Sequence, residues 1–98
     1  MAENPGMDAI RLSPDDSVAT VLRAVTRGEK LRIGSGGAVT VIEAVENIPL
    51  CHKIALVALG RGDRILKYGE PIGEATQAIR PGCHVHVHNL RSLRARAR

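Results

Sequence analysis

The chain has 98 residues, which suffice for one small domain but not for a catalytic barrel together with a cofactor domain. Its formal net charge is +4, but four of its 14 basic residues lie in the last eight positions, so the other ten basic residues balance the ten acidic ones. A formally neutral body without Phe or Trp lacks both the basic surface and the stacking rings used to bind nucleic acid, so we expect no nucleic-acid partner.

The composition favours β structure. Val, Ile and Leu are frequent, and ten glycines and five prolines are typical of short strands joined by turns. No stretch has the roughly 18 apolar residues of a membrane span, and the N-terminus lacks the pattern of a signal peptide. We therefore expect a mostly β, cytoplasmic protein without a membrane partner, in which Cys51 and Cys83 stay reduced.

The expected elements follow from turn signals and from the spacing of apolar residues. In chain order they are a loose leader (1–8), a short strand closed by a turn (10–16), an ambiguous segment (17–26), a β-hairpin around a glycine-rich turn (31–42), an apolar run (54–59), a strand (64–68), about one helical turn (74–78), a last strand (83–90) and a basic tail (91–98). The segment 17–26 fits a helical stripe and a strand followed by one helical turn equally well. The turns at 27–29, 61–63 and 81–82 each precede a short apolar strand.

Three of the four histidines alternate along the last expected strand, at His84, His86 and His88. Alternate residues of a strand point to the same face, so their imidazoles would share one face. Two histidines at this spacing can chelate Zn, Fe, Mn or Ni, whereas the outer two of three lie about 13 Å apart. The candidate metal pairs are therefore His86 with His88 or His84 with His86, completed by His52 or a carboxylate. The alternative is a polar face that meets water or a partner protein.

Three further side chains could act on an anion. Lys53, Lys67 or Tyr68 could hold a carboxylate or transfer a proton near the histidine face, although each of these residues alone is more often an ordinary surface residue. No Ser-His-Asp or Cys-His triad can be nominated. Each cysteine directly precedes a histidine, and neighbours on a strand face opposite ways.

Three motifs together make the sequence similar to a known family. They are His52-Lys53-Ile54-Ala55, then Lys67-Tyr68-Gly69-x-Pro71-Ile72-Gly73-x-Ala75-Thr76-x-x-Ile79, and then Gly82-x-x-Val85-His86-x-His88-Asn89-Leu90. The chain resembles, over residues 10–90, the SAF domain of altronate and galactarate dehydratases. That domain also occurs as the separate small subunit of two-subunit lyases, including sulfolactate sulfo-lyase. The resemblance implies a β-clip (SAF, or antifreeze-like) fold over residues 9–90, made of short interlocked strands with one or two short helical turns.

The resemblance also implies a function, that of the small subunit of a hydroxy-acid lyase. Sugar-acid members remove water from a hydroxy acid, usually with Fe(II) or Mn(II), and a larger catalytic subunit carries most of that machinery. The chain is then expected to be inactive alone and to complete the active site of that partner, with homo-oligomer formation left open. Alternatives are the small subunit of a sulfolactate sulfo-lyase, a non-catalytic carboxylate- or carbohydrate-binding module, and a structural β-clip protein.

The family's recurrent polar positions carry over residue by residue. The expected catalytic groups and metal ligands are His86 and His88, and the expected substrate-binding residues are His52, Lys67, Tyr68 and Asn89. Cys51 stands where the family commonly has Gly, and Cys83 and His84 also depart from the family pattern. The resemblance therefore assigns no role to His84 or to either cysteine.

Overall fold

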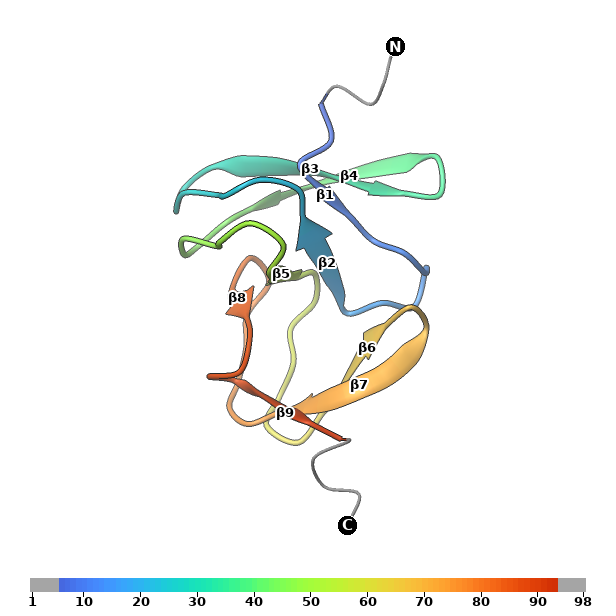
Figure 1. Cartoon of the computed structure of the whole chain (residues 1–98), viewed down its shortest axis with the longest axis vertical. Helices are drawn as coiled ribbons and strands as arrows, with labels where there is room; N and C mark the ends of the chain where they lie inside the picture. Colours follow the sequence, from blue (N-terminus) through green and yellow to red (C-terminus); the bar gives the residue numbers. More distant parts are fainter. Residues whose placement is uncertain (1–5, 94–98) are drawn as a thin grey trace.

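The computed structural model describes residues 6–93. Most of the expected leader (1–8) and of the expected basic tail (91–98) lies outside these residues. Within them the chain forms strands and no helix, and thus no helix that could cross a membrane (Figure 1). The strands are β1 (Ala9–Ile10), β2 (Val18–Val21), β3 (Lys30–Ser35), β4 (Ala38–Glu43), β5 (Lys53–Ala55), β6 (Arg64–Lys67), β7 (Glu70–Ala75), β8 (His84–Val85) and β9 (Leu90–Ser92).

The strands form two sheets, one towards each end of the molecule (Figure 1). The larger sheet has the order β4-β3-β1-β2-β5-β8, and the smaller one has the order β6-β7-β9. Only the pairing of β1 with β3 is parallel. The prediction of a mostly β fold of short strands is therefore confirmed, and the architecture is consistent with a β-clip.

The expected helical turns are not found among residues 6–93, and that part of the prediction was wrong. In the segment 17–26, β2 pairs with β1 on one side and with β5 on the other, so its β-branched residues lie in the middle of a sheet. Near residues 74–78, strand β7 continues to Ala75, which pairs with Leu90, and Ile79 forms a bridge with Leu59. Tertiary pairing outweighs local helix propensity at both places.

The predicted hairpin is confirmed as β3 and β4. A two-residue turn, Gly36-Gly37, links Ser35 to its partner Ala38, and both glycines have a positive φ, of 54° and 91°. This is the conformation that two-residue hairpins require and that glycine adopts most readily.

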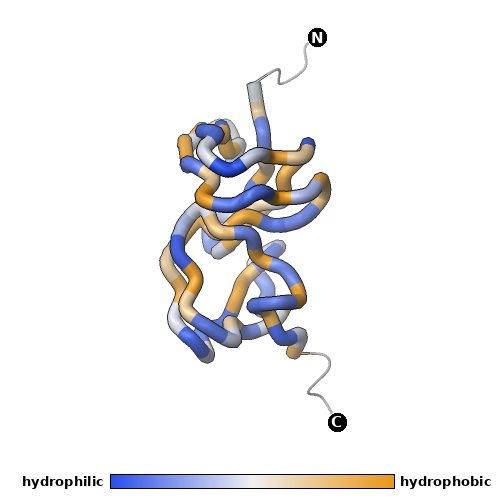
Figure 2. The backbone as a smooth tube through the Cα atoms, turned by 90° about the vertical axis from the view of Figure 1, so that its left-hand side faces the viewer, coloured by the Kyte–Doolittle hydropathy of each residue, from blue (hydrophilic) through white to orange (hydrophobic). Residues whose placement is uncertain are grey.

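The core is aliphatic and consists of two clusters on opposite sides of the β2–β5 pair. Ala19 and Ile54 belong to the first cluster, with Leu31 and Ile33, whereas Val18 belongs to the second. The alternation of side chains along β2 and β5 thus supplies both clusters. Figure 2 shows the matching pattern, in which short apolar segments alternate with polar ones along the chain.

Three turns, which we call the glycine turns, share one backbone pattern. In each, the glycine has φ near 90° and donates its N–H to an alanine carbonyl, and the N–H of that alanine donates to the carbonyl after the glycine. The turns are 26–29 with Gly28 and Ala44, 60–63 with Gly62 and Ala75, and 80–83 with Gly82 and Ala55. Strands β3, β6 and β8 each begin directly after one of them.

Candidate functional site

The pairing of β5 with β8 brings His52 to the last histidines of the chain. Lys53 pairs with Val85 and Ile54 pairs with His84, so His52, just before β5, lies across from His86. Cys51 precedes it with φ of 72°, in the left-handed region where glycine is favoured. The resemblance leads us to expect Gly at this position, and a glycine would adopt this positive φ readily.

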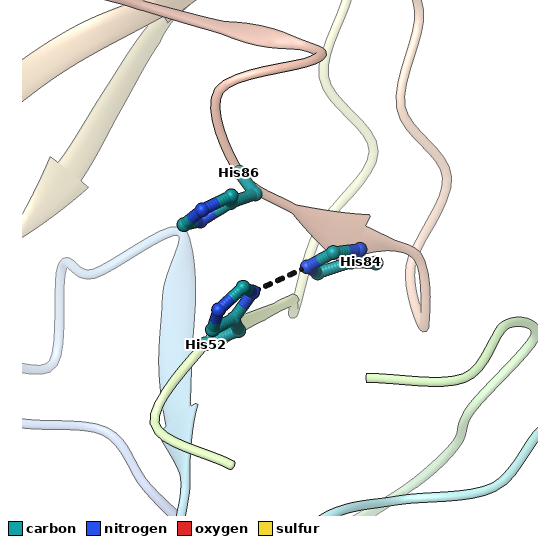
Figure 3. Close-up of side chains that lie close together, drawn as sticks. All are labelled: His52, His84 and His86. Atoms are coloured by element: carbon teal, nitrogen blue, oxygen red, sulfur yellow. Dashed lines mark hydrogen bonds between the residues drawn. The ribbon is translucent and has the colours of Figure 1, made fainter. Parts of the chain in front are cut away.

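His52, His84 and His86 form one cluster, shown in Figure 3. The Nδ1 atom of His52 lies 2.8 Å from the Nε2 atom of His84, within hydrogen-bonding distance. The ring centroids of His52 and His86 are 3.9 Å apart, and those of His52 and His84 are 5.0 Å apart. The three rings are nearly parallel, with interplanar angles of 12° to 26°. His84, to which the resemblance assigns no role, is therefore in direct contact with His52 and His86, whose positions matched the family.

The expected continuous strand over residues 83–90 was wrong. The chain turns at residues 86–89, between β8 and β9, because Asn89 offers the backbone local hydrogen bonds in place of a strand partner. Its side-chain oxygen accepts from the His86 N–H at 3.0 Å, and its side-chain amide donates to the His84 carbonyl at 2.9 Å. The turn also brings the rings of His84 and His88 to a centroid distance of 5.0 Å instead of about 13 Å.

Glu46 is an acidic residue beside the cluster, and no pattern in the sequence indicated it. Its carboxylate accepts from the backbone N–H of His84 at 3.2 Å. One carboxylate oxygen of Glu46 and one ring nitrogen from each of His84 and His88 lie within 4.8 Å of one another. His84 therefore belongs to two groups of candidate ligands, one with His52 and His86 and one with Glu46 and His88.

The surroundings of His84 and His86 favour their neutral imidazoles. Desolvation, followed by the neighbouring histidines, lowers the pKa of His84 from its usual 6.5, and Glu46 opposes this in part. Desolvation, then His52, Lys53 and His88, lowers the pKa of His86. Burial and the charge of Lys67 likewise lower the pKa of Lys53. The neutral form of His84 and His86 keeps a ring lone pair that can bind a metal or accept a proton.

The remaining expected site residues lie in two places. Lys67 ends β6 with its Nζ atom 5.0 Å from the ring centroid of Tyr68, and Tyr68 is 64% exposed at the tip of the β6–β7 hairpin. Asn89, by contrast, is buried, and its side chain is engaged in the turn just described. The structure thus brings His52 and His86 together and leaves Lys67 and Tyr68 on a neighbouring hairpin. The side chain of Asn89 is used to hold the backbone of the turn.

Asp16 supports that hairpin, although the sequence indicated only a local turn. This carboxylate is 3% exposed and accepts from the backbone N–H groups of Ser13, Tyr68 and Gly69 at 3.1, 3.0 and 2.8 Å. The Ser-Pro-Asp-Asp motif indicates an Asx-type turn from local sequence alone. The contacts of Asp16 with Tyr68 and Gly69 join residues 52 and 53 positions apart, and no local pattern indicates them.

The donor set of the cluster discriminates among the metals implied by the family resemblance. Imidazole nitrogens suit Fe(II), Zn(II), Co(II) and Ni(II), whereas Mn(II) prefers oxygen ligands. One nitrogen from each of His52, His84 and His86 lies within 4.8 Å of the other two. The cluster therefore fits Fe(II) better than Mn(II).

Comparison with known proteins gives a consistent set of similarities. The family model for the altronate/galactarate dehydratase SAF domain matches residues 7–93. The chain is 40% identical over 83 residues to an altronate dehydratase of Bacillus subtilis, which covers 85% of this chain but 16% of that enzyme. It is 31% identical over 86 residues to the altronate dehydratase of Escherichia coli, covering 88% of this chain and 17% of that enzyme. It is also 33% identical over 91 residues to the (2R)-sulfolactate sulfo-lyase subunit alpha of Chromohalobacter salexigens, covering 90% of this chain and 97% of that subunit.

Proposed function

Because the chain belongs to the altronate/galactarate dehydratase SAF-domain family, we propose that it is the small subunit of a hydroxy-acid lyase. The proposed reaction is the elimination of water from a sugar acid, as in altronate dehydratase. The similarity to a sulfo-lyase subunit alpha over 97% of that subunit supports a two-chain arrangement, with a larger partner that carries most of the catalytic machinery.

The observation that carries this proposal is the histidine cluster beside Lys53, on a domain of this family. A hydroxy-acid substrate is an anion, and Lys53 provides positive charge next to His86, with Lys67 close enough to Lys53 to act on its pKa. In this proposal His52, Lys67 and Tyr68 bind carboxylate and hydroxyl oxygens of the substrate at the exposed face. Asn89 acts as a positioning residue, since its hydrogen bonds hold the turn that carries His86 and His88.

The elimination itself moves one proton and one leaving group. A neutral His86 accepts the proton from the carbon next to the carboxylate, and the electron pair of that C–H bond forms the new double bond as the β-carbon–oxygen bond breaks. The leaving hydroxyl takes up a proton, for which protonated His88 is the proposed donor, and departs as water. Fe(II) or Mn(II), held mainly by the larger subunit, would supply Lewis-acid stabilisation of the charge that develops on the carboxylate.

The second candidate is a sulfolactate sulfo-lyase small subunit, favoured by the same 97% coverage. The proton abstraction would be the same, but a carbon–sulfur bond would break in place of a carbon–oxygen bond. A non-catalytic carboxylate-binding module is the alternative from a different class, and it would bind its ligand without any partner.

The test is co-purification of the tagged chain from its native cells, followed by assays of the eluate with altronate, galactarate and (2R)-sulfolactate. We expect a larger subunit to be recovered together with lyase activity on one of these acids, and the active acid distinguishes the two candidates. A chain that is recovered alone and is inert, but binds a hydroxy acid by itself, would replace the lyase proposal with the binding-module alternative.

A further inference from the structure

We propose that His52, His84 and His86 form a metal site of this chain's own, which binds one Fe(II), Co(II) or Zn(II) ion through three imidazole nitrogens. The inference concerns the isolated chain without partner or substrate. It is an alternative to the base role given to His86 in the proposed elimination, because a metal-bound imidazole nitrogen has no lone pair left to accept a proton. Of the two histidine pairs that the spacing allowed, the structure favours His84 with His86, completed by His52, over His86 with His88.

The distances between the nitrogens support this site. The Nδ1 atom of His52 and the Nε2 atom of His84 face each other at 2.8 Å, a distance at which one shared proton lies between them. Two imidazole nitrogens on one tetrahedral ion, each about 2.1 Å from the metal, are about 3.4 Å apart. An ion can therefore replace the shared proton when the two rings separate by a few tenths of an ångström.

The backbone under the three ligands is fixed. Strands β5 and β8 pair at Ile54 and His84. This pairing holds His52, just before β5, next to His84 at the start of β8. The His86 N–H is held by the side chain of Asn89. Side chains can adjust to an ion here, while the positions of their Cα atoms are already determined.

One adjustment is required. A bound ion lies close to the plane of each imidazole that ligates it, but the three rings are stacked with interplanar angles of 12° to 26°. His86 is the ring that has to rotate, because His52 and His84 already direct nitrogens at each other. Rotation about the Cβ–Cγ bond of histidine has a broad energy minimum, so it costs little. Metal binding should therefore break the stack of His52 and His86.

Glu46 and His88 complete the environment without being ligands of this ion. The Glu46 carboxylate lies within 4.8 Å of a ring nitrogen of His84, and a carboxylate beside a metal-bound histidine is the common outer partner of such sites. Three protein ligands leave coordination positions open for oxygen atoms of a bound acid, whose charge would offset the neighbouring Lys53.

The experiment is a titration of the full-length chain with Co(II), followed by visible absorption and calorimetry. We expect one ion to bind per chain, with the ligand-field bands of a nitrogen-ligated site. Substitutions His84→Ala and His52→Ala should each weaken binding by more than about 100-fold, exceeding the loss seen when only an outer partner is removed. His88→Ala should change it by less than tenfold. Arg64→Ala is the matched control, because Arg64 follows its glycine turn as His84 follows its own, and it should leave binding unchanged.

Several results would overturn the proposal. They are the absence of saturable Co(II) binding, binding that His84→Ala leaves unchanged, and binding that is lost in the Cys51→Ser, Cys83→Ser double variant but kept in His84→Ala. If His84→Ala does not fold, paramagnetic shifts of the histidine ring protons in the unsubstituted chain decide the matter. Shifts on His52, His84 and His86 support the site, and shifts confined to His88 contradict it. None of these measurements uses lyase activity, so a failed metal site and a failed lyase assignment are told apart.

Discussion

The glycine turns at 60–63 and 80–83 have the same backbone but different surroundings. Gly62 and Gly82 have φ of 91° and 90°. Each donates its N–H to an alanine carbonyl, and the N–H of that alanine donates to the carbonyl of the residue after the glycine. Gly62 is exposed and has no atom within 4 Å of the place of a Cβ, whereas Gly82 is buried and a Cβ there would overlap the backbone oxygen of Glu43. The first turn lies at the surface, and the second packs against the backbone at Glu43, the last residue of β4.

The residue after each glycine differs as well. In the first turn the Asp63 side chain accepts from the Gly60 N–H at 2.7 Å, and in the second turn Cys83 has replaced that acid. A charged, exposed Arg64 then starts β6, whereas a half-buried His84 starts β8. The comparison teaches that this turn determines where a strand begins, and that the residues beside the glycine determine whether the strand can carry chemistry.

The largest effect is expected on activity. His86→Ala should lower turnover of the reconstituted two-subunit complex by about 10²–10⁴-fold, the usual contribution of a positioned acid or base. Arg64→Ala, on the strand after the other turn, should leave turnover unchanged. Steady-state rates on the substrate identified by co-purification make the comparison, with circular dichroism to verify the fold. Equal rates for the two variants would remove His86 from the site.

The next effect concerns the stability of the two turns. Gly62→Ala meets only an unfavourable φ and should cost about 1–2 kcal/mol of the free energy of unfolding. Gly82→Ala meets the same φ and also overlaps the backbone at Glu43, so we expect a loss of about 3–5 kcal/mol. Urea denaturation followed by far-UV circular dichroism measures both values. Similar losses in the two variants would mean that the close packing around Gly82 adds nothing to the cost of the substitution.

A smaller effect is expected from the acid that closes the exposed turn. Asp63→Ala removes the acceptor of the Gly60 N–H and should cost about 0.5–1.5 kcal/mol of the free energy of unfolding. Asp63→Asn keeps a side-chain oxygen at the same position and should lose less. The same urea experiment applies, and an Asn variant that loses as much stability as the Ala variant would show that the charge, and not the hydrogen bond, closes the turn.

The smallest effect is a dependence of stability on pH that comes from His84 and His86, the histidines that follow the glycine turn at 80–83. The pKa values of His84 and His86 are lowered in the folded chain, so below the usual value of 6.5 the unfolded chain binds more protons than the folded one. The free energy of unfolding should therefore decrease as pH falls from 6.5 towards the lowered pKa values and then level off. Urea denaturation across this range, with a chelator present, tests it. A His84→Ala, His86→Ala double variant that keeps the same decrease would contradict it.

Local patterns predicted much of this fold. Turn residues and alternating apolar positions gave the β class and the β3–β4 hairpin, and the recurring turns at 27–29, 61–63 and 81–82 correspond to the starts of β3, β6 and β8. The break after Val85 was missed because an Asn89 that hydrogen-bonds to its own turn looks, in sequence, like a polar residue of a strand. The strand through Val18 was ambiguous because only its pairing with β5 makes it extended.

The site was predicted in part, for an equally physical reason. The spacing of the histidines indicated a common face, which brings His84 and His86 together in the structure. The choice of partners could not be made, because the contact of His52 with His84 joins residues 32 positions apart through the register of β5 and β8. Glu46 and Asp16 enter through tertiary contacts alone.

The three hydrogen bonds accepted by Asp16 have a consequence for ligand capture. They tie the Tyr68 and Gly69 amides at the tip of the β6–β7 hairpin to the segment that precedes β2. A tip held in this way is already ordered when a ligand arrives, so the entropic penalty of arranging Lys67 and Tyr68 is met during folding and not during association. A ligand that reached Lys67 and Tyr68 would thus meet a hairpin whose backbone is already in place.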